Sequence, residues 1–500
     1  MHGRILARNA LWNLAGQLAP VVFALVAIPV LISSLGKDRF GVLTLIWAAI
    51  GYFGLFDFGL GRALTQTVGA ALGTNDLDSL ESLPRTALGL MVGFGMVAAV
   101  LVFAVTPWLV RVPLKVPASL QGEAAMSFYL LGVSLPFVLA TAGLRGLLEA
   151  HQDFEIATAI RVPFAAVNYL GPMVAVAFSH SLVPSVATLL IGRIGAWLTH
   201  RRVCLKRYAY LSNGRPPAVQ ALWSLIRTGA WMTVSNVISP LMYNVDRFFV
   251  GALLSMAAVT YYVTAFELAS KLLLIPAAIL GVLFPAMASA YAGDPDRACR
   301  LTERAIRIMT VLMFIPVVLV VALAHIGLRV WVGAEMARVD TRLLQCLVIG
   351  VLANSVAQIP FAAIQAVGRP DVTAKLHLVE LPAYVVVLVW LTRSLGVQGV
   401  AIAWTARMTI DCVALLVLAA VKVPALRAAV VRPLGFVGAA IALAGLPALV
   451  HGATARAFTT SAVICVFAVI AWRWGIGRTD RELARRALHA AYRRERARAA

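Results

Sequence analysis

The sequence predicts an all-α polytopic membrane protein, and two observations support that prediction. Hydrophobic residues make up 61% of the 500 residues and charged residues only 13%, whereas a soluble domain carries roughly 45–50% apolar and about 25% charged residues. Apolar stretches long enough to span a bilayer, about 20 residues each, also recur along the chain. These features exclude a soluble enzyme, a secreted disulfide scaffold and a disordered chain.

We expect about fourteen transmembrane helices. The first begins after Arg4 and Arg8 and is longer than the core of a signal peptide, so we interpret it as a retained helix. The expected spans lie near residues 11–35, 41–71, 86–110, 124–149, 156–179, 182–200, 223–254, 258–291, 305–332, 342–367, 373–393, 398–420, 432–450 and 459–475.

The distribution of basic residues predicts the orientation of the chain. Lys and Arg are concentrated in one set of connections and in the C-terminal tail: Arg4, Arg8, Arg201, Arg202, Lys206, Arg207, Arg215, Arg297, Arg300, Arg304, Arg369, Lys422, Arg427, Arg432 and residues 478–500. The opposite connections hold few: Lys37, Arg39, Arg111, Lys115, Arg338, Arg393 and Arg456. Because basic loops stay in the cytoplasm, we expect both termini there.

Two matches at nearly the same spacing indicate an internal repeat. Asp76 and Asp78 resemble Asp294 and Asp296. The stretch 149–156 resembles 365–372, and its offset along the chain is almost equal to that of the first match. Such parallel repeats are typical of transporters with two lobes around a cavity. We therefore expect a six-helix lobe over 1–215, a second over 216–421, two additional helices over 422–477 and a basic cytoplasmic tail over 478–500.

Ionisable residues lie inside several expected spans. They cost about 2.5–3.5 kcal/mol each on insertion and by default mark a pathway. As binding residues for an anion we select the bases Arg62, Arg145, Arg247, Lys271 and Arg407, because a guanidinium offers phosphate a planar fork. As counter-ions or proton carriers we select the acids Asp57, Asp246, Glu267 and Asp411. Glu380 with His377, and Arg161 with Arg193, are further ionisable groups at depth.

Structural alternatives remain open for these groups. Glu267 with Lys271, and Arg407 with Asp411, are four residues apart and can neutralise each other on one helix. Arg145, Arg161 and Arg193 can instead extend to the cytoplasmic interface.

Several classes of ligand and activity are not expected. The net charge of +21 lies in loops and tail rather than in a basic soluble domain, so we expect no nucleic-acid partner. The five cysteines and the histidines lack metal-ligand spacing, so we expect no metal and no cofactor. The external loops are too short to hold catalytic groups, so we expect no enzyme and assign no catalytic residue.

Three stretches resemble a known family. They are Asn13 to Arg62, including Asp57-Phe-Gly-Leu-Gly-Arg62, then Ser235 to Tyr262, including Asp246-Arg247-Phe248, and Gln365 to Lys375. They resemble polysaccharide-biosynthesis flippases, the O-antigen and exopolysaccharide repeat-unit translocases. This family is a branch of the multidrug/oligosaccharidyl-lipid/polysaccharide exporter superfamily.

The resemblance implies movement of an undecaprenyl-pyrophosphate-linked oligosaccharide across the bacterial plasma membrane by alternating access, with an ion gradient as the energy source. It makes a polysaccharide polymerase or chain-length regulator a candidate partner. The family's usual twelve spans differ from the fourteen expected here. Two alternatives stay open: a multidrug or organic-cation antiporter of the same superfamily, and a membrane enzyme of lipid-linked glycan assembly.

Overall fold

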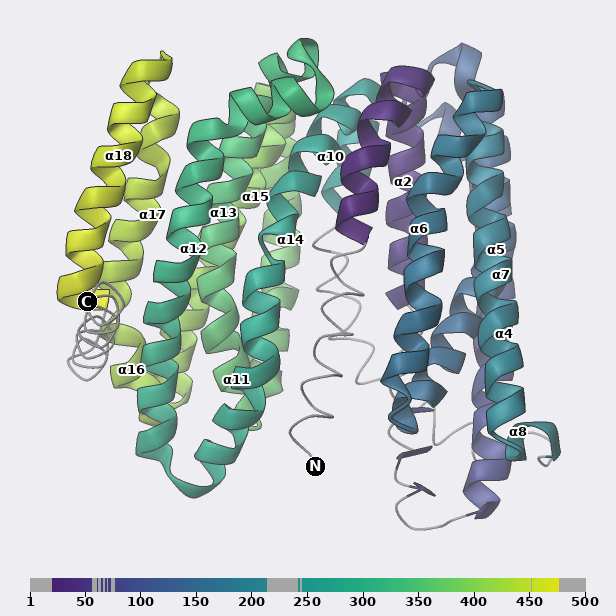
Figure 1. Ribbon diagram of the computed structural model, residues 1–500, viewed down its shortest axis with the longest axis horizontal. Helices are drawn as coiled ribbons and strands as arrows, with labels where there is room; N and C mark the ends of the chain where they lie inside the picture. Colours follow the sequence, from purple (N-terminus) through teal and green to yellow (C-terminus); the bar gives the residue numbers. More distant parts are fainter. Residues whose placement is uncertain are drawn as a thin grey trace, which may run out of the picture. The chain divides into compact units, whose positions relative to one another are not determined.

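A computed structural model gives the structure of the chain. It describes residues 20–55, 77–213, 245–450 and 452–475, with residues 61, 64, 65, 68, 69, 71, 72 and 242 between them. The regular elements of these residues are all helices (Figure 1). The predicted all-α fold class is confirmed.

The chain forms two compact units. The first contains residues up to Thr264 together with Thr392–Val397, and the second contains Ala265–Leu391 and the residues from Gln398 onward. The change of unit at 264/265 lies within α10 (Met256–Lys271). The domain limits expected from the sequence, at 215, 421 and 477, stay predictions.

In the first unit α5 (Gln121–Ala150) is the central helix. It packs against α4 (Leu77–Arg111), α7 (Leu182–Arg207), α2 (Lys37–Leu55) and α6 (Phe154–Phe178). The contact between α4 and α5 requires Gly95, because a Cβ at this position would lie 2.5 Å from the Cα of Pro136. The unit also contains a helix at Pro20–Leu35, η1 (Ala118–Leu120), α8 (Tyr210–Asn213) and helical residues 245–253.

In the second unit α13 (Ala334–Ala366) is the central helix. It packs against α12 (Pro295–Val332), α11 (Leu274–Gly293) and α17 (Leu434–Leu449). Helices α17 and α18 pack against each other and against α12, at one edge of this unit in Figure 1. The remaining elements are α14 (Pro370–Leu395), α15 (Val397–Lys422), η2 (Pro424–Leu426), α16 (Arg427–Val431), α18 (Ala453–Ile470) and a π-helical turn at Ala471–Gly475.

The helix boundaries repeat at the spacing that the sequence predicts. Helices α5 and α13 end at Ala150 and Ala366, and α6 and α14 begin at Phe154 and Pro370, both at the offset that relates 149–156 to 365–372. Helices α4 and α12 begin at 77 and 295, at the offset that relates Asp76 to Asp294. The two central helices, α5 and α13, therefore occupy equivalent places in the repeat.

Ten helices of the described residues are long and apolar enough to cross a membrane, or eleven if the bent pair Pro424–Val431 and Leu434–Leu449 is one span. The expected count of fourteen is not confirmed. Three of the expected spans, 11–35, 41–71 and 223–254, lie partly outside the residues that the structure describes. Many large apolar side chains point outward, among them Phe178, Ile191, Val330 and Phe458, as expected of surfaces that face lipid.

Two helices differ in detail from the expected spans. Over the span expected at 258–291 the helix is interrupted at Leu272 and Leu273, before α11, and Met256–Gly281 is still long and apolar enough to cross a membrane. Pro276 lies in the first turn of α11, where its missing N–H breaks no helical hydrogen bond. The connection expected before residue 305 is the first part of α12, because Asp294 accepts a hydrogen bond from the backbone N–H of Arg297 at 2.9 Å and Pro295 occupies the first turn.

Candidate functional site

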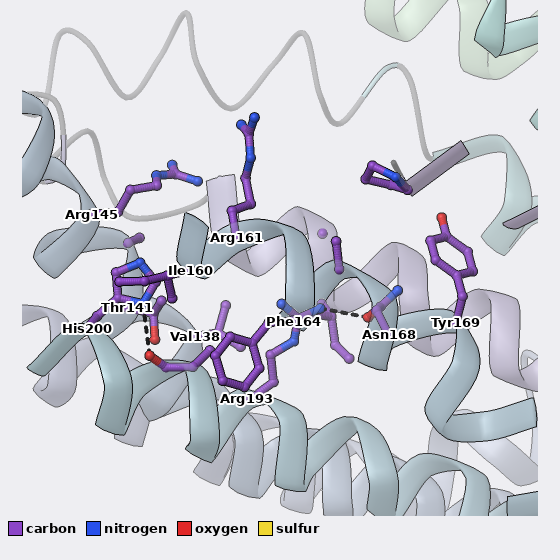
Figure 2. A pocket seen from close by; sticks show the side chains of 16 residues that line it. Val138, Thr141, Arg145, Ile160, Arg161, Phe164, Asn168, Tyr169, Arg193 and His200 are labelled. Atoms are coloured by element: carbon purple, nitrogen blue, oxygen red, sulfur yellow. Dashed lines mark hydrogen bonds between the residues drawn. The ribbon is translucent and has the colours of Figure 1, made fainter. Parts of the chain in front are cut away.

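A basic pocket lies inside the first unit, with a volume of about 410 Å³ (Figure 2). Side chains of α5, α6 and α7 line most of it, and Pro20, Ile50 and Gly51 close one side. The polar lining residues are Thr141, Arg145, Arg161, Asn168, Tyr169, Arg193 and His200. No carboxylate is among the described residues that line it. The pocket therefore concentrates positive charge between helices that are long and apolar enough to cross a membrane.

Of the three arginines that line the pocket, Arg161 has the fewest hydrogen-bond partners among the described residues. Its Nε and one terminal nitrogen are buried and make no hydrogen bond with any group that the structure describes. Figure 2 shows the guanidinium groups of Arg145 and Arg161 on the same side of the pocket. Two like charges repel in such a setting, and buried donors without acceptors are costly. An anion with several oxygens would relieve both effects.

The other two arginines have partial partners. Arg193 donates a hydrogen bond to the side-chain oxygen of Asn168 at 2.8 Å, which fixes its guanidinium against α6. Arg145 forms an ion pair with Glu149, one turn further along α5, at 3.4 Å. Both members of that pair are nearly half exposed, so the pair contributes little to stability. Arg145 remains available to a ligand.

A hydrogen-bonded clamp sets the relative position of the helices that carry these arginines. Asp153, between α5 and α6, accepts two hydrogen bonds from Arg207 at 3.1 Å each and one from the Tyr208 hydroxyl at 2.7 Å. Burial of the phenol, followed by its hydrogen bond to Asp153, raises the pKa of Tyr208, so the hydroxyl remains a donor at neutral pH. The Tyr208 ring also stacks on His151, with ring centroids 3.9 Å apart. This clamp joins the start of α6 to the end of α7.

The residues selected from the sequence are distributed over both units. Arg145 lines the basic pocket, whereas Asp57 and Arg62 lie outside the described residues. Asp246 is fully buried and accepts hydrogen bonds from the Tyr262 hydroxyl and from the backbone N–H of Arg247. Arg247 is buried as well, but it is not among the residues that line the basic pocket.

A second group of charges lies inside the second unit, between α14 and α15. Nε of Arg407 donates to Oε1 of Glu380 at 3.0 Å, and Nε2 of His377 lies 3.6 Å from Oδ1 of Asp411. The guanidinium of Arg407 also lies over the ring of Tyr384, 5.2 Å from its centroid. We call His377, Glu380, Arg407 and Asp411 the polar cluster.

The i, i+4 spacing within a helix predicted the partner of Lys271 but not the partners of Arg407 and Asp411. The alternative in which Glu267 and Lys271 neutralise each other is confirmed, because their side chains form an ion pair of 2.6 Å. Arg407 and Asp411 have the same spacing, yet each contacts a residue of α14. Lys271 and Glu267 therefore compensate each other on one helix, whereas Arg407 and Asp411 belong to the polar cluster.

Sequence reasoning noted Arg161, Arg193, His377 and Glu380 as ionisable groups at depth but did not select them. The signal that could have found the first two is the succession of Arg145, Arg161 and Arg193 on three consecutive helices. In the topology expected from the sequence, each lies in the half of its expected span that is predicted to face the cytoplasm.

The fold defines a class of protein: a polytopic helical membrane protein. The solved structures with this fold include an inward-facing multidrug resistance MATE family transporter of the MOP superfamily, with a TM-score of 0.71 and 14% identity over 82% of this chain and 95% of that chain. They also include the lipid II flippase MurJ in an inward closed conformation, with a TM-score of 0.69 and 13% identity over 93% of this chain and 99% of that chain.

Within this class, a sequence model of the family described as "Polysaccharide biosynthesis protein" matches residues 6–291. The chain belongs to this family. It is 29% identical to the "Putative O-antigen transporter" of Shigella flexneri over 82% of this chain and 96% of that protein. It is 21% identical to the "Uncharacterized membrane protein EpsK" of Bacillus subtilis (strain 168), over 78% of each chain.

Proposed function

We propose that this protein translocates undecaprenyl-pyrophosphate-linked oligosaccharides across the bacterial plasma membrane by alternating access. The observation that carries the proposal is the basic pocket, in which Arg145, Arg161 and Arg193 face a common space without a lining carboxylate among the described residues. A pyrophosphate carries several anionic oxygens, and guanidinium groups bind such oxygens through paired, charge-assisted hydrogen bonds. Relatives named for O-antigen transport and lipid II flipping support the same substrate class.

The pocket is also better suited to an anion than to a cation. An antiporter of organic cations needs an acidic or aromatic cavity, because unpaired guanidinium groups repel a cation. This chain shares its fold with a multidrug transporter, but the sequence identity of 14% is too low for the fold to indicate the ligand. The surrounding aromatic and polar groups, Tyr169 and Asn168 among them, offer hydrogen bonds to sugar hydroxyls.

The direction of transport and its coupling belong to the proposal as well. We place both termini in the cytoplasm, the basic pocket on the side where substrate is loaded, and an ion gradient as the energy source. Asp57, Asp246, Glu267 and Asp411 are the acids proposed to balance or carry charge. Arg62, Arg247, Lys271 and Arg407 are proposed to contact the anion along its path. A polymerase or chain-length regulator would receive the product.

The test is translocation by the purified protein in proteoliposomes, with a labelled polyprenyl-pyrophosphate oligosaccharide and an imposed ion gradient. We expect protein-dependent movement that Arg161→Ala reduces at least tenfold. Arg111→Ala is the matched control, because Arg111 is an exposed arginine of the same unit at the end of α4 and does not line the pocket. Efflux of a cationic dye with no movement of any glycan would overturn the proposal in favour of a drug antiporter.

A further inference from the structure

The basic pocket of the first unit contains two hydrogen-bond acceptors that an ionised phosphate cannot use. They belong to the side chains of Thr141 on α5 and His200 on α7, which line the pocket together with the three arginines. The oxygens of an ionised phosphate accept hydrogen bonds and donate none. An acceptor in an anion pocket therefore needs a donor from another part of the ligand.

Backbone carbonyl groups use the donors of both side chains. The Thr141 hydroxyl donates to the carbonyl of Phe137 at 2.7 Å. Nδ1 of His200 lies 2.8 Å from the carbonyl of Ala196 (Figure 2). A carbonyl has no proton to give, so Nδ1 carries the proton of this contact. The atoms left for a ligand are Oγ1 of Thr141, through its lone pairs, and Nε2 of His200.

The buried Nε2 of His200 is the stronger evidence for a ligand. His200 is only 4% exposed, and this atom makes no hydrogen bond with any group that the structure describes. A buried polar atom without a partner is costly. A proton on Nε2 would add a fourth positive charge to a pocket lined by three guanidinium groups and by no carboxylate of the described residues. The arrangement therefore favours Nε2 as an acceptor.

The two acceptors lie at the same level of the pocket. Helices α5 and α7 run in the same direction, because α6 returns the chain between them. The thiol of Cys204, one turn after His200, donates to the carbonyl of Leu144 at 3.6 Å, and Leu144 lies one turn after Thr141. Arg145 is also one turn after Thr141, on the same face of α5. The acceptors therefore adjoin a guanidinium group that is available to the anion.

We infer that the basic pocket recognises an anion with a hydrogen-bond donor beside its charged oxygens, and that Thr141 and His200 accept from this donor. The inference rests on the proposed function, in which the ligand is a pyrophosphate linked to a sugar. The arginines hold the pyrophosphate, and a hydroxyl or amide N–H of the attached sugar donates to Nε2 of His200 and Oγ1 of Thr141.

This recognition separates a lipid carrier that bears a glycan from the bare carrier. A site built to hydrogen-bond a substrate hydroxyl or N–H rejects the analogue that lacks it, because the buried polar atom is then left unpaired. Polyprenyl pyrophosphate without a sugar offers the arginines the same kind of charge but gives Nε2 of His200 no donor. The specificity for the sugar-bearing lipid therefore lies beside the charged group and does not require contact with the rest of the glycan.

The experiment is equilibrium binding of two probes to the protein in nanodiscs. The probes are a polyprenyl pyrophosphate and the same lipid with one N-acetylhexosamine, at about pH 8, where the terminal phosphate is ionised because its second pKa is about 6. We expect the wild type to prefer the sugar-bearing probe at least about tenfold. His200→Phe keeps a planar ring without the acceptor and should reduce this preference to about threefold or less.

Three further variants make the result specific. His200→Gln restores an acceptor and should recover part of the preference. Thr141→Val removes the second acceptor from the other helix and should reduce the preference by a smaller factor, so the inference remains testable if His200→Phe does not fold. His325→Phe is the matched control and should keep the full preference, because His325 lies in the second unit, where Nδ1 contacts the Thr341 hydroxyl at 3.3 Å.

Two outcomes would overturn the inference while the proposed function holds. One is a wild type that binds both probes with equal affinity. The other is an equal loss of affinity for both probes in His200→Phe, which would show that His200 contacts the phosphate or supports the fold. A wild type that binds neither probe contradicts the proposed function itself, and the inference with it.

Discussion

The arginines of the basic pocket and the arginine of the polar cluster are the same residue type within membrane-spanning helices, but they meet different partners. In the first unit, three guanidinium groups share one amide and one half-exposed carboxylate. In the second unit, Arg407 faces Glu380 and lies close to a second acid that contacts His377. The first arrangement gathers guanidinium groups without a lining carboxylate among the described residues, and the second places two carboxylates beside one guanidinium and one imidazole. A position inside a span makes a charged residue a candidate for function, and its partners separate a binding role from a structural one.

The largest expected effect is a difference in thermal stability between variants of the polar cluster and variants of the basic pocket. Arg407→Ala leaves the buried carboxylates of Glu380 and Asp411 without their cation. Breaking a buried pair by removing one member costs about 3–5 kcal/mol, so the variant should lose several degrees or more in Tm, or fail to fold. Arg161→Ala removes a like charge from the neighbourhood of Arg145 and should leave the Tm unchanged or slightly raised. Thermal unfolding of both variants in detergent measures the contrast.

A double variant, Glu380→Gln with Arg407→Met, serves as the control for this contrast. Removing both charges together should recover most of the stability, because replacing a whole buried pair is often neutral. If Arg161→Ala were as destabilising as Arg407→Ala, the basic pocket would be a structural feature rather than a binding site.

The next effect concerns the affinity of the basic pocket for a pyrophosphate. Arg161→Ala should weaken binding of a polyprenyl pyrophosphate roughly 10- to 150-fold, the equivalent of about 1.5–3 kcal/mol for hydrogen bonds to a charged group. Arg161→Lys should recover only part of the loss, since an ammonium lacks the planar fork. Equilibrium binding to the protein in nanodiscs measures both. A weaker affinity in Glu267→Gln of equal size would contradict the assignment of anion binding to the first unit.

A third effect tests how closely α13 and α15 must pack. At Gly350 of α13, a Cβ would lie 2.7 Å from the ring of Trp404 and 3.0 Å from the Cα of Thr405 on α15. Gly350→Ala should therefore cost about 1–3 kcal/mol by overpacking and lower the Tm. Gly327→Ala on α12 is the control, because nothing lies within 4 Å of a Cβ there. Equal Tm values for the two variants would show that α13 and α15 separate easily.

The comparison also shows what the sequence could predict. Apolar runs placed α5, α6, α14, α15 and α17 within a few residues of both ends, because the bilayer fixes the length and composition of a span. Helices α4, α12 and α13 begin well before their apolar runs, with polar first turns that this rule does not cover. The offset between the repeated stretches predicted the paired ends of α5 and α13, since a duplicated chain repeats its turns. The partners of Arg407 and Asp411 were not predictable in this way. Their i, i+4 spacing suggested a pair within α15, and only the packing of α14 on α15 brings Glu380 and His377 to them. The same limitation hid the grouping of Arg145, Arg161 and Arg193 in one pocket.

The smallest expected effect concerns the clamp that aligns the arginine-bearing helices. Tyr208→Phe removes the hydroxyl that donates to Asp153 but keeps the ring stacked on His151, so the loss should be about 0.5–1.5 kcal/mol, the net value of one hydrogen bond. Asp153 retains the two hydrogen bonds from Arg207. A small fall in Tm with an unchanged polar cluster is therefore expected, together with a modest loss of pyrophosphate affinity because α6 and α7 carry Arg161 and Arg193. An affinity that stays constant while the Tm falls would show that the basic pocket keeps its geometry without the clamp, and that packing on α5 alone positions its arginines.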